Sequence, residues 1–204
     1  MSEIRSESVQ TDQLRFRRNM ERLGEIFAYE ISKKLTFEKR EIVSPLGVSE
    51  MKLIKEFPIL ATILRAGLPL HQGLLNYFDH SDSAFISAYR RHHKNGRFDI
   101  ELEYTSCPDI NNKVLILADP MLATGASMEI TYKSLLQFGK PKHTHIVTAI
   151  ASLEGINSIK RKLNMNKVSL WVGAIDDELT AQSYIVPGLG DAGDLAYGEK
   201  LQLS

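Results

Sequence analysis

Apolar and polar positions along the chain predict an alternation of strands and helices. Five short, mainly apolar runs are typical of strands: 57–64, 84–91, 113–118, 144–151 and 168–174. Segments with apolar residues three to four positions apart predict helices: 12–35, 68–78, 125–138 and 154–163. Such an order predicts an α/β fold with a mainly parallel sheet and helices on both faces.

The two ends of the chain lack this rhythm. Residues 1–10 are polar and predict a loose arm. Ser44-Pro45-Leu46-Gly47 breaks the chain, and a second helix is expected at about 48–56, so that about 11–56 form a helical arm. The tail 184–198 is rich in Gly and Asp and is expected to contain no regular element.

Residues 84–104 predict an antiparallel β-hairpin flap. Ile100, Leu102 and Tyr104 alternate with two glutamates, as in a strand with one solvated face. Asn95-Gly96 is a strong hairpin signal because both turn positions favour positive φ. The tip of this flap would carry a basic group: Arg90, Arg91, His92, His93, Lys94 and Arg97.

Composition narrows the class of protein. The 204 residues hold 25 Lys+Arg and 25 Asp+Glu, so no net field attracts nucleic acid or anionic lipid. No apolar run approaches the roughly 18 residues of a membrane span, and the start lacks the apolar core of a signal peptide. The single Cys107 excludes an internal disulfide and fits a reducing compartment. One cytoplasmic domain, 1–204, without nucleic-acid or membrane partners is expected.

Three unusual stretches follow predicted strands: Arg65-Ala66-Gly67, Asp119–Ser127 and the Gly-rich tail. In a doubly wound sheet, ligands bind outside the carboxyl ends of the strands. We therefore expect these three stretches to converge on one site.

The second stretch, DPMLATGAS at 119–127, has the chemistry of a sugar-phosphate site. A helix is expected to begin near Gly125, where unpaired backbone N–H groups and the helix dipole favour a phosphate. Thr124 and Ser127 add hydroxyl donors, and Asp119 would accept from ribose hydroxyls. The alternative is a capped helix beside a turn acid. Without a Gly-Lys-Ser/Thr ending, this is not the phosphate loop of ATPases.

Further motifs occur in order with DPMLATGAS: ILRAG at 63–67, Tyr89-Arg90, AIASLEGI at 149–156 and YIVPGLGDAGD at 184–194. Together they resemble the uracil phosphoribosyltransferase family from about residue 14 to 198. The resemblance implies a type I phosphoribosyltransferase-like fold. It also implies uracil and 5-phosphoribosyl-1-pyrophosphate (PRPP) as substrates.

The resemblance also implies a role for each motif. The ribose 5-phosphate of PRPP would be bound by Asp119, Pro120, Met121, Leu122, Ala123, Thr124, Gly125, Ala126 and Ser127. Arg65 and Arg90 would meet the pyrophosphate, since a guanidinium fork matches its oxygens. Uracil would be held by Ile185, Gly190, Asp191 and Ala192. Asp191 would also face PRPP, and Asp119, Asp191 and Arg65 would be the catalytic residues. A surface ion pair for Arg65 and a turn role for Asp191 are the alternatives.

The expected mechanism needs no covalent catalyst. No Ser–His–acid order, zinc spacing or cysteine nucleophile is present, and adjacent His92 and His93 on a strand would point to opposite faces. The enzyme would position uracil N1 against C1 of PRPP, giving UMP and pyrophosphate, with the flap as a lid. Mg²⁺ would arrive bound to PRPP, and no metal site on the protein is expected. The family and the exposed apolar positions of the first long helix and the flap imply a homodimer or higher homo-oligomer.

Some positions depart from the family pattern. Ala126 stands where a second Gly is common, Leu153 replaces a Pro, Tyr104–Pro108 is atypical, and Ser44 replaces a Thr. Two other functions therefore stay open. One is a phosphoribosyltransferase for another base, and the other is a non-catalytic PRPP- or nucleotide-sensing module that regulates RNA.

Overall fold

A seven-stranded sheet forms the centre of the computed structural model, which describes residues 1–92 and 98–200 but not the side chains of 88–102. The strand order is β5-β4-β3-β6-β8-β7, with β9 paired to β8, and β4–β5 is the antiparallel pair. The strands are β3 Ile59–Leu64, β4 Ser83–His92, β5 Phe98–Ser106, β6 Val114–Ala118, β7 Met121–Leu122, β8 His143–Ser152 and β9 Val168–Asp176. The predicted mainly parallel sheet is confirmed.

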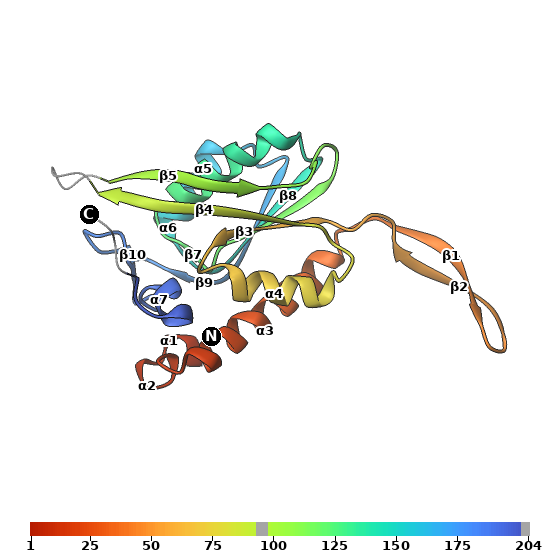
Figure 1. Ribbon diagram of the computed structural model, residues 1–204, viewed down its shortest axis with the longest axis horizontal. Helices are drawn as coiled ribbons and strands as arrows, with labels where there is room; N and C mark the ends of the chain where they lie inside the picture. The colour runs from red at the N-terminus through yellow and green to blue at the C-terminus, as the bar shows by residue number, and fades with distance from the viewer. Residues whose placement is uncertain (93–97, 201–204) are drawn as a thin grey trace.

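Helices cover both faces of this sheet (Figure 1). One face carries α3 Gln13–Ser32 and α4 Leu68–Tyr77; the other carries α5 Ala126–Leu135, the 3₁₀ turn Leu136–Phe138 and α6 Leu153–Lys162. α3 and α4 approach closely because Gly24 and Gly73 lie at their crossing, where a Cβ on either would collide with the backbone of the other helix. Among the described helices, none combines the length and apolar character that crossing a membrane requires.

The first ten residues are ordered against the body, so the predicted loose arm is wrong. They form two four-residue helices, α1 Ser2–Arg5 and α2 Glu7–Gln10. Ile4 is fully buried in a cluster with Ile185, Leu189 and Ala192. These partners lie far along the chain, so the local polarity of the segment does not reveal them.

The predicted helix at 48–56 is also wrong, and with it the second half of the helical arm at 11–56. Residues Phe37–Ser44 and Gly47–Ile54 form an antiparallel hairpin, β1–β2, that projects from the body (Figure 1). Pro45 and Leu46 form its turn, and the Ser44 hydroxyl donates to the carbonyl of Gly47 at 2.9 Å. The chain break predicted at 44–47 is real, but strands flank it.

The flap and the tail complete the fold. β4 and β5 pair as predicted, whereas the Asn95-Gly96 turn lies outside the described residues. The tail is more regular than expected: Ile185–Val186 (β11) pairs with Glu178–Leu179 (β10), and Ala192–Tyr197 forms helix α7. Asp191 caps α7 by accepting from the backbone N–H groups of Gly193 and Asp194, which explains how a Gly-rich segment becomes helical.

Candidate active site

The loop Arg65-Ala66-Gly67 between β3 and α4 lies against the end of β6. Thr62 Oγ1 donates to the carbonyl of Ala118 at 3.2 Å, and a Cβ on Gly67 would lie 3.1 Å from the same oxygen. It would also collide with Thr62 Oγ1, so the backbone passes where a side chain has no room. The loop after β3 and the turn after β6 are therefore neighbours.

The DPMLATGAS turn is joined to β8 through its backbone. Asp119 N donates to the carbonyl of Val147 at 3.0 Å, and the Pro120 carbonyl accepts from Ala149 N at 3.1 Å and Ile150 N at 3.0 Å. Ser152 Oγ donates to the carbonyl of Ala123 while accepting from Gly155 N at 2.8 Å. The backbone of this segment is thus held in place while Asp119 stands at the strand end.

Helix α5 begins where the phosphate is expected. Gly125 is its N-cap with φ of 79°, in the left-handed region that favours glycine. Among the described residues this N-cap supplies no side-chain hydrogen bond, and Ala126 N donates to Thr124 Oγ1 at 3.4 Å. By contrast, α6 and α7 are capped by Ser152 and Asp191. Ala126 is the first helical residue and has no positive φ, so its methyl group introduces no backbone strain.

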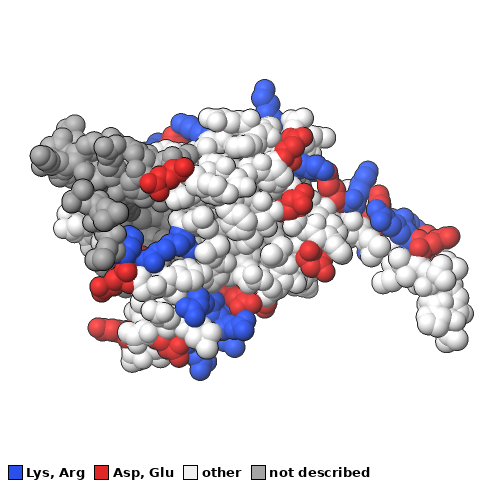
Figure 2. All heavy atoms as spheres, viewed as in Figure 1, with Lys and Arg blue, Asp and Glu red and all other residues white. Residues whose placement is uncertain are grey.

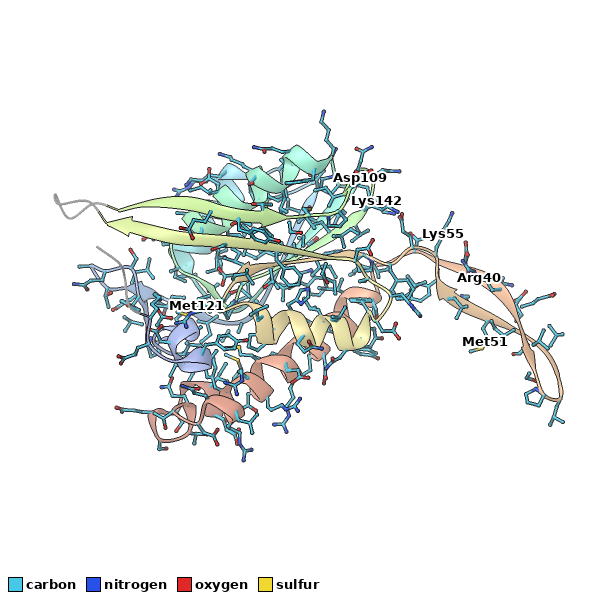
Figure 3. All side chains as sticks on the ribbon, viewed as in Figure 1. Arg40, Met51, Lys55, Asp109, Met121 and Lys142 are labelled. Carbon is cyan, nitrogen blue, oxygen red and sulfur yellow. The ribbon has the colours of Figure 1, made fainter. Side chains whose placement is uncertain are left out.

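The Gly-rich tail meets both of these loops, as their places after parallel strands predict. Met121, Ala123 and Ala66 pack against one buried apolar cluster that includes four residues of the tail: Ile185, Leu189, Ala192 and Ala196. Figure 3 shows Met121 beside α7. The segments expected to hold PRPP and uracil therefore share one apolar base.

Two carboxylates of the tail pair with cations at this meeting point. Arg65 Nη2 donates to Asp194 Oδ1 at 2.7 Å and to the carbonyl of Gly198 at 2.7 Å. Lys200 Nζ donates to Asp191 Oδ2 at 3.0 Å and lies 3.6 Å from Asp194 Oδ1. Burial raises the pKa of Asp191, but hydrogen bonds from Lys200, Asp194 N and Gly193 N outweigh it and lower the pKa overall.

A second network holds the base of the tail. Arg5 donates from both terminal nitrogens to the two oxygens of Asp176, each at 2.8 Å, and Nη1 also donates to the carbonyl of Gly188 at 3.1 Å. Gly188 N donates back to Asp176 Oδ2 at 2.9 Å. The hydrogen bond from Arg5 lowers the pKa of Asp176, against the effect of burial.

Of the other residues discussed from the sequence, Gly190 and Cys107 are described by the structure and the side chain of Arg90 is not. Gly190 has φ of 92°, and a Cβ there would meet no atom of the described residues within 4 Å, so those residues leave space beside its backbone. Arg90 lies on β4 opposite Ile100, but its side chain and the basic tip of the flap are outside what the structure describes. Burial, with a smaller effect of Asp109, raises the pKa of Cys107 to about 11, which makes it a poor nucleophile.

Sequence reasoning missed Arg5, Asp176, Lys200 and the partner role of Asp194. A signal existed for two of them. Asp176 follows two residues after the strand predicted at 168–174, and Asp191 with Asp194 three residues later resembles the start of a helix. Arg5 gave no signal, because its partner lies 171 positions away.

Solved structures define the fold class. The AQ2163 protein of Aquifex aeolicus superposes with a TM-score of 0.84 at 30% identity, covering 94% of this chain and 91% of that one. A hypoxanthine phosphoribosyltransferase of Staphylococcus aureus superposes with a TM-score of 0.53 at 15% identity, covering 80% and 76%. The fold is that of the type I phosphoribosyltransferases, as predicted.

Sequence comparison identifies the family within that class. The family described as uracil phosphoribosyltransferase matches residues 1–199. A uracil phosphoribosyltransferase of Porphyromonas gingivalis is 55% identical over 199 residues, covering 98% of this chain and 92% of the relative. The chain belongs to the uracil phosphoribosyltransferase family, and this match favours neither of the two alternative functions.

Proposed function

We propose that this enzyme transfers the 5-phosphoribosyl group of PRPP to N1 of uracil, giving UMP and pyrophosphate. The observation that supports the site assignment is that Ala66, Met121 and Ala123 pack against one buried apolar cluster to which the tail contributes Ile185 and Ala192. This shared cluster supports a site in which the turn expected to bind phosphate, the loop of Arg65 and the Gly-rich tail meet at one edge of the sheet, where ligands of such sheets bind.

PRPP would lie along the turn from Asp119 to Ser127. Its 5-phosphate would sit at the N-terminus of α5, where backbone N–H groups beyond Ala126, whose N–H donates to Thr124 Oγ1, would donate to an anion. The Asp119 carboxylate at the strand end would accept hydrogen bonds from the ribose hydroxyls. Backbone hydrogen bonds of Asp119 and Pro120 to β8 hold this turn rigid, which favours a precise pose for C1.

Pyrophosphate would be met by Arg65, and Arg90 of the flap stays a prediction for the same role. Arg65 is held by Asp194 and the Gly198 carbonyl, both on the tail that would bind uracil. Its contact with the leaving group would therefore be coupled to the position of the uracil loop. A charge-assisted, forked contact to the leaving oxygens stabilises the charge that develops on bond breaking.

Uracil would lie against the backbone of Ile185 and of Gly190 to Ala192. Uracil presents two carbonyl acceptors and one N–H donor along an edge, and backbone groups match that edge when no side chain intervenes. The open space at Gly190 provides room for a flat ring. Asp191 keeps its place through its cap on α7 and its contact with Lys200.

Mg²⁺ fits this arrangement as an ion that PRPP brings. Among the described residues, no group of three or more His, Cys, Asp or Glu side chains is arranged to hold a metal ion. Asp191 and Asp194 are engaged by Lys200 and Arg65, so pyrophosphate oxygens and water would hold the ion. Bound there, Mg²⁺ would neutralise charge on the leaving group.

The chain itself contributes positioning, charge and exclusion of water. Breaking the bond from C1 to pyrophosphate builds positive charge on the ribose, and uracil N1 attacks from the opposite face with inversion. The carboxyl groups of Asp119 and Asp191 would favour that positive charge, and the lowered pKa of Asp191 keeps its group ionised. Arg65 would favour the departing anion. No covalent intermediate on the enzyme is needed.

A rate assay with two isosteric variants tests this function. Wild type, Asp119→Asn and Asp191→Asn are given labelled uracil, PRPP and Mg²⁺, and UMP is measured. We expect wild-type turnover and a fall of about 10²-fold or more in each variant. Asn also caps helices well, so α7 should persist. Asp109→Asn is the matched control, because Asp109 is exposed and far from Met121 (Figure 3).

Tight UMP binding by wild type without turnover would instead favour the non-catalytic alternative. Formation of GMP or IMP in place of UMP would favour another base. Unchanged rates in both Asn variants would contradict the assigned site.

We further infer that two copies of the chain assemble through the β1–β2 hairpin. A two-stranded hairpin is marginally stable alone in water, yet this one exposes 83% of Val43 and all of Leu46, with Val48 and Met51 also exposed. Its end is uncharged in Figure 2. Such an apolar projection fits a partner subunit, and the exposed Ile26 and Tyr29 of α3 extend the apolar surface. A cytoplasmic location stays a prediction from composition.

A further inference from the structure

The N-terminal segment is tied directly to the loop that would bind uracil. α1 has four residues and is too short to be stable alone, so tertiary contacts must hold it. The buried Ile4 supplies one contact, and the guanidinium of Arg5 supplies the other. Both lead to the segment 185–192.

Arg5 and Asp176 form a bidentate pair that is largely withdrawn from solvent. The Asp176 side chain is 7% exposed and that of Arg5 is 24% exposed. Two parallel N–H···O contacts of 2.8 Å fix the relative orientation of both groups. This pair is therefore stronger and more directional than the surface ion pairs elsewhere on the molecule.

The Arg5–Asp176 pair binds both the backbone N–H and the backbone carbonyl of Gly188 in the tail. Gly188 donates its N–H to Asp176 and accepts at its carbonyl from Arg5. Gly188 has φ of 57°, and a Cβ there would collide with the carbonyl oxygen of Ile185. The turn at Gly188 sets the direction in which the chain continues to Gly190 and Asp191.

We propose that Arg5 and Asp176 are positioning residues for uracil, acting through Gly188 on the backbone that pairs with the base. This rests on the proposed function of the tail. A loop that must be ordered on binding loses affinity through the entropy of ordering. The Arg5–Asp176–Gly188 network removes that loss by holding the loop in its binding shape.

The contacts of Arg5 predict different effects on the binding of uracil and of PRPP. The turn 119–127 is held by β8 and by Ser152, with no contact to Arg5 among the hydrogen bonds of the described residues. Loss of Arg5 should therefore weaken uracil binding while leaving the grip on the ribose phosphate intact. A role in general stability alone would affect both substrates alike.

The test uses the full chain with Arg5→Ala, Arg5→Lys and Asp176→Asn. We expect the KM for uracil to rise about tenfold or more in Arg5→Ala, with the KM for PRPP changed less than about twofold. Arg5→Lys keeps the charge but loses the fork, so an intermediate rise is expected. Arg161→Ala is the matched control, since Arg161 is exposed in the last turn of α6 and should leave both constants unchanged.

Hydrogen–deuterium exchange gives a readout that does not depend on turnover. Amides of 186–191 should exchange at least about tenfold faster in Arg5→Ala than in wild type, and those of 121–127 should not. If wild type forms no UMP, the proposed function is overturned. The difference in exchange between wild type and Arg5→Ala would still show whether Arg5 orders the loop 186–191. Unchanged exchange at 186–191, or an equal rise of both KM values in the three variants, would overturn the positioning role.

Discussion

Arg65 donates a 2.7 Å hydrogen bond to Asp194, and this contact joins the loop after β3 to helix α7 across 129 positions of sequence. The same nitrogen donates to the carbonyl of Gly198 at 2.7 Å. The cation expected at the leaving group is therefore engaged by the segment expected at the base. Pyrophosphate would compete with a carboxylate for the same guanidinium.

Replacing Arg65 should lower the catalytic efficiency toward PRPP. We expect kcat/KM for PRPP to fall by about 10²-fold or more in Arg65→Ala, and by less in Arg65→Lys, which keeps the charge without the fork. Initial rates at varied PRPP and saturating uracil measure this. Asp194→Asn is the comparison variant, because it removes the carboxylate charge that competes with pyrophosphate for Arg65. It should leave the KM for PRPP unchanged or lower it. Wild-type constants in Arg65→Ala would show that Arg65 serves structure alone.

Removing Lys200 should move the acid limb of the pH–rate profile. Burial raises the pKa of Asp191, and the hydrogen bond from Lys200 is the largest effect that lowers it. In Lys200→Met the pKa of Asp191 should rise, so activity that needs the carboxylate should be lost at a higher pH as the medium is acidified. The stability change should stay under about 1 kcal/mol, because this pair is partly exposed. Lys133→Met, an exposed pair partner of Glu129 in the last turn of α5, is the control. Superimposable pH–rate profiles for wild type and Lys200→Met would exclude the coupling.

The central sheet was predictable because its signals are local. β3 and β6 are short apolar runs, and a strand buried on both faces requires such a run. The start of helix α5 near Gly125 was also predictable, since Gly and small polar residues follow a buried strand there. Positions after parallel strands then place the three loops at one edge without any knowledge of long-range contacts.

The errors arise where burial and pairing are not local. In the hairpin, Val48, Met51 and Ile54 are three positions apart and imitate a helix, but their side chains are exposed or half-buried in this chain. The N-terminal segment is polar apart from Met1, Ile4 and Val9, and its order depends on the distant residues Asp176 and Ile185. Sequence spacing contains no record of such contacts.

The hairpin should be required for assembly but not for the fold of one subunit. Val43→Asp combined with Leu46→Asp places two charges on its apolar end, which should shift the protein from a dimer toward a monomer of 23.0 kDa. Sedimentation velocity measures the mass, and circular dichroism checks that the fold persists. Leu136→Asp adds a charge at an exposed apolar position on the body and should leave the mass unchanged. A double variant that remains fully dimeric would place the interface elsewhere.

A buried histidine on β8 makes stability depend on pH. Trp171 Nε1 donates to His145 Nδ1 at 3.0 Å, so this nitrogen must be unprotonated, and the two rings pack edge to face. Burial, with a smaller effect of His143, lowers the pKa of His145 to about 4. Burial also lowers the pKa values of His143 and His71. Protonation of any of the three therefore opposes folding.

Stability should fall as the pH drops from about 6.5, where an unfolded histidine titrates, toward about 4, where His145 titrates in the fold. In that window the unfolded state binds a proton that the folded state does not. The free energy of unfolding therefore falls by at most about 3 kcal/mol through His145 alone. Carboxylates with lowered pKa values, such as Asp176, reduce the stability of the fold on protonation only as the pH falls below about 4.5. Urea unfolding at pH 7, 6 and 5 therefore isolates the histidines. His145→Gln keeps an acceptor for Trp171 without titrating, so the slope should flatten, whereas His80→Gln at an exposed site should keep it. Equal slopes in wild type and His145→Gln would contradict this account.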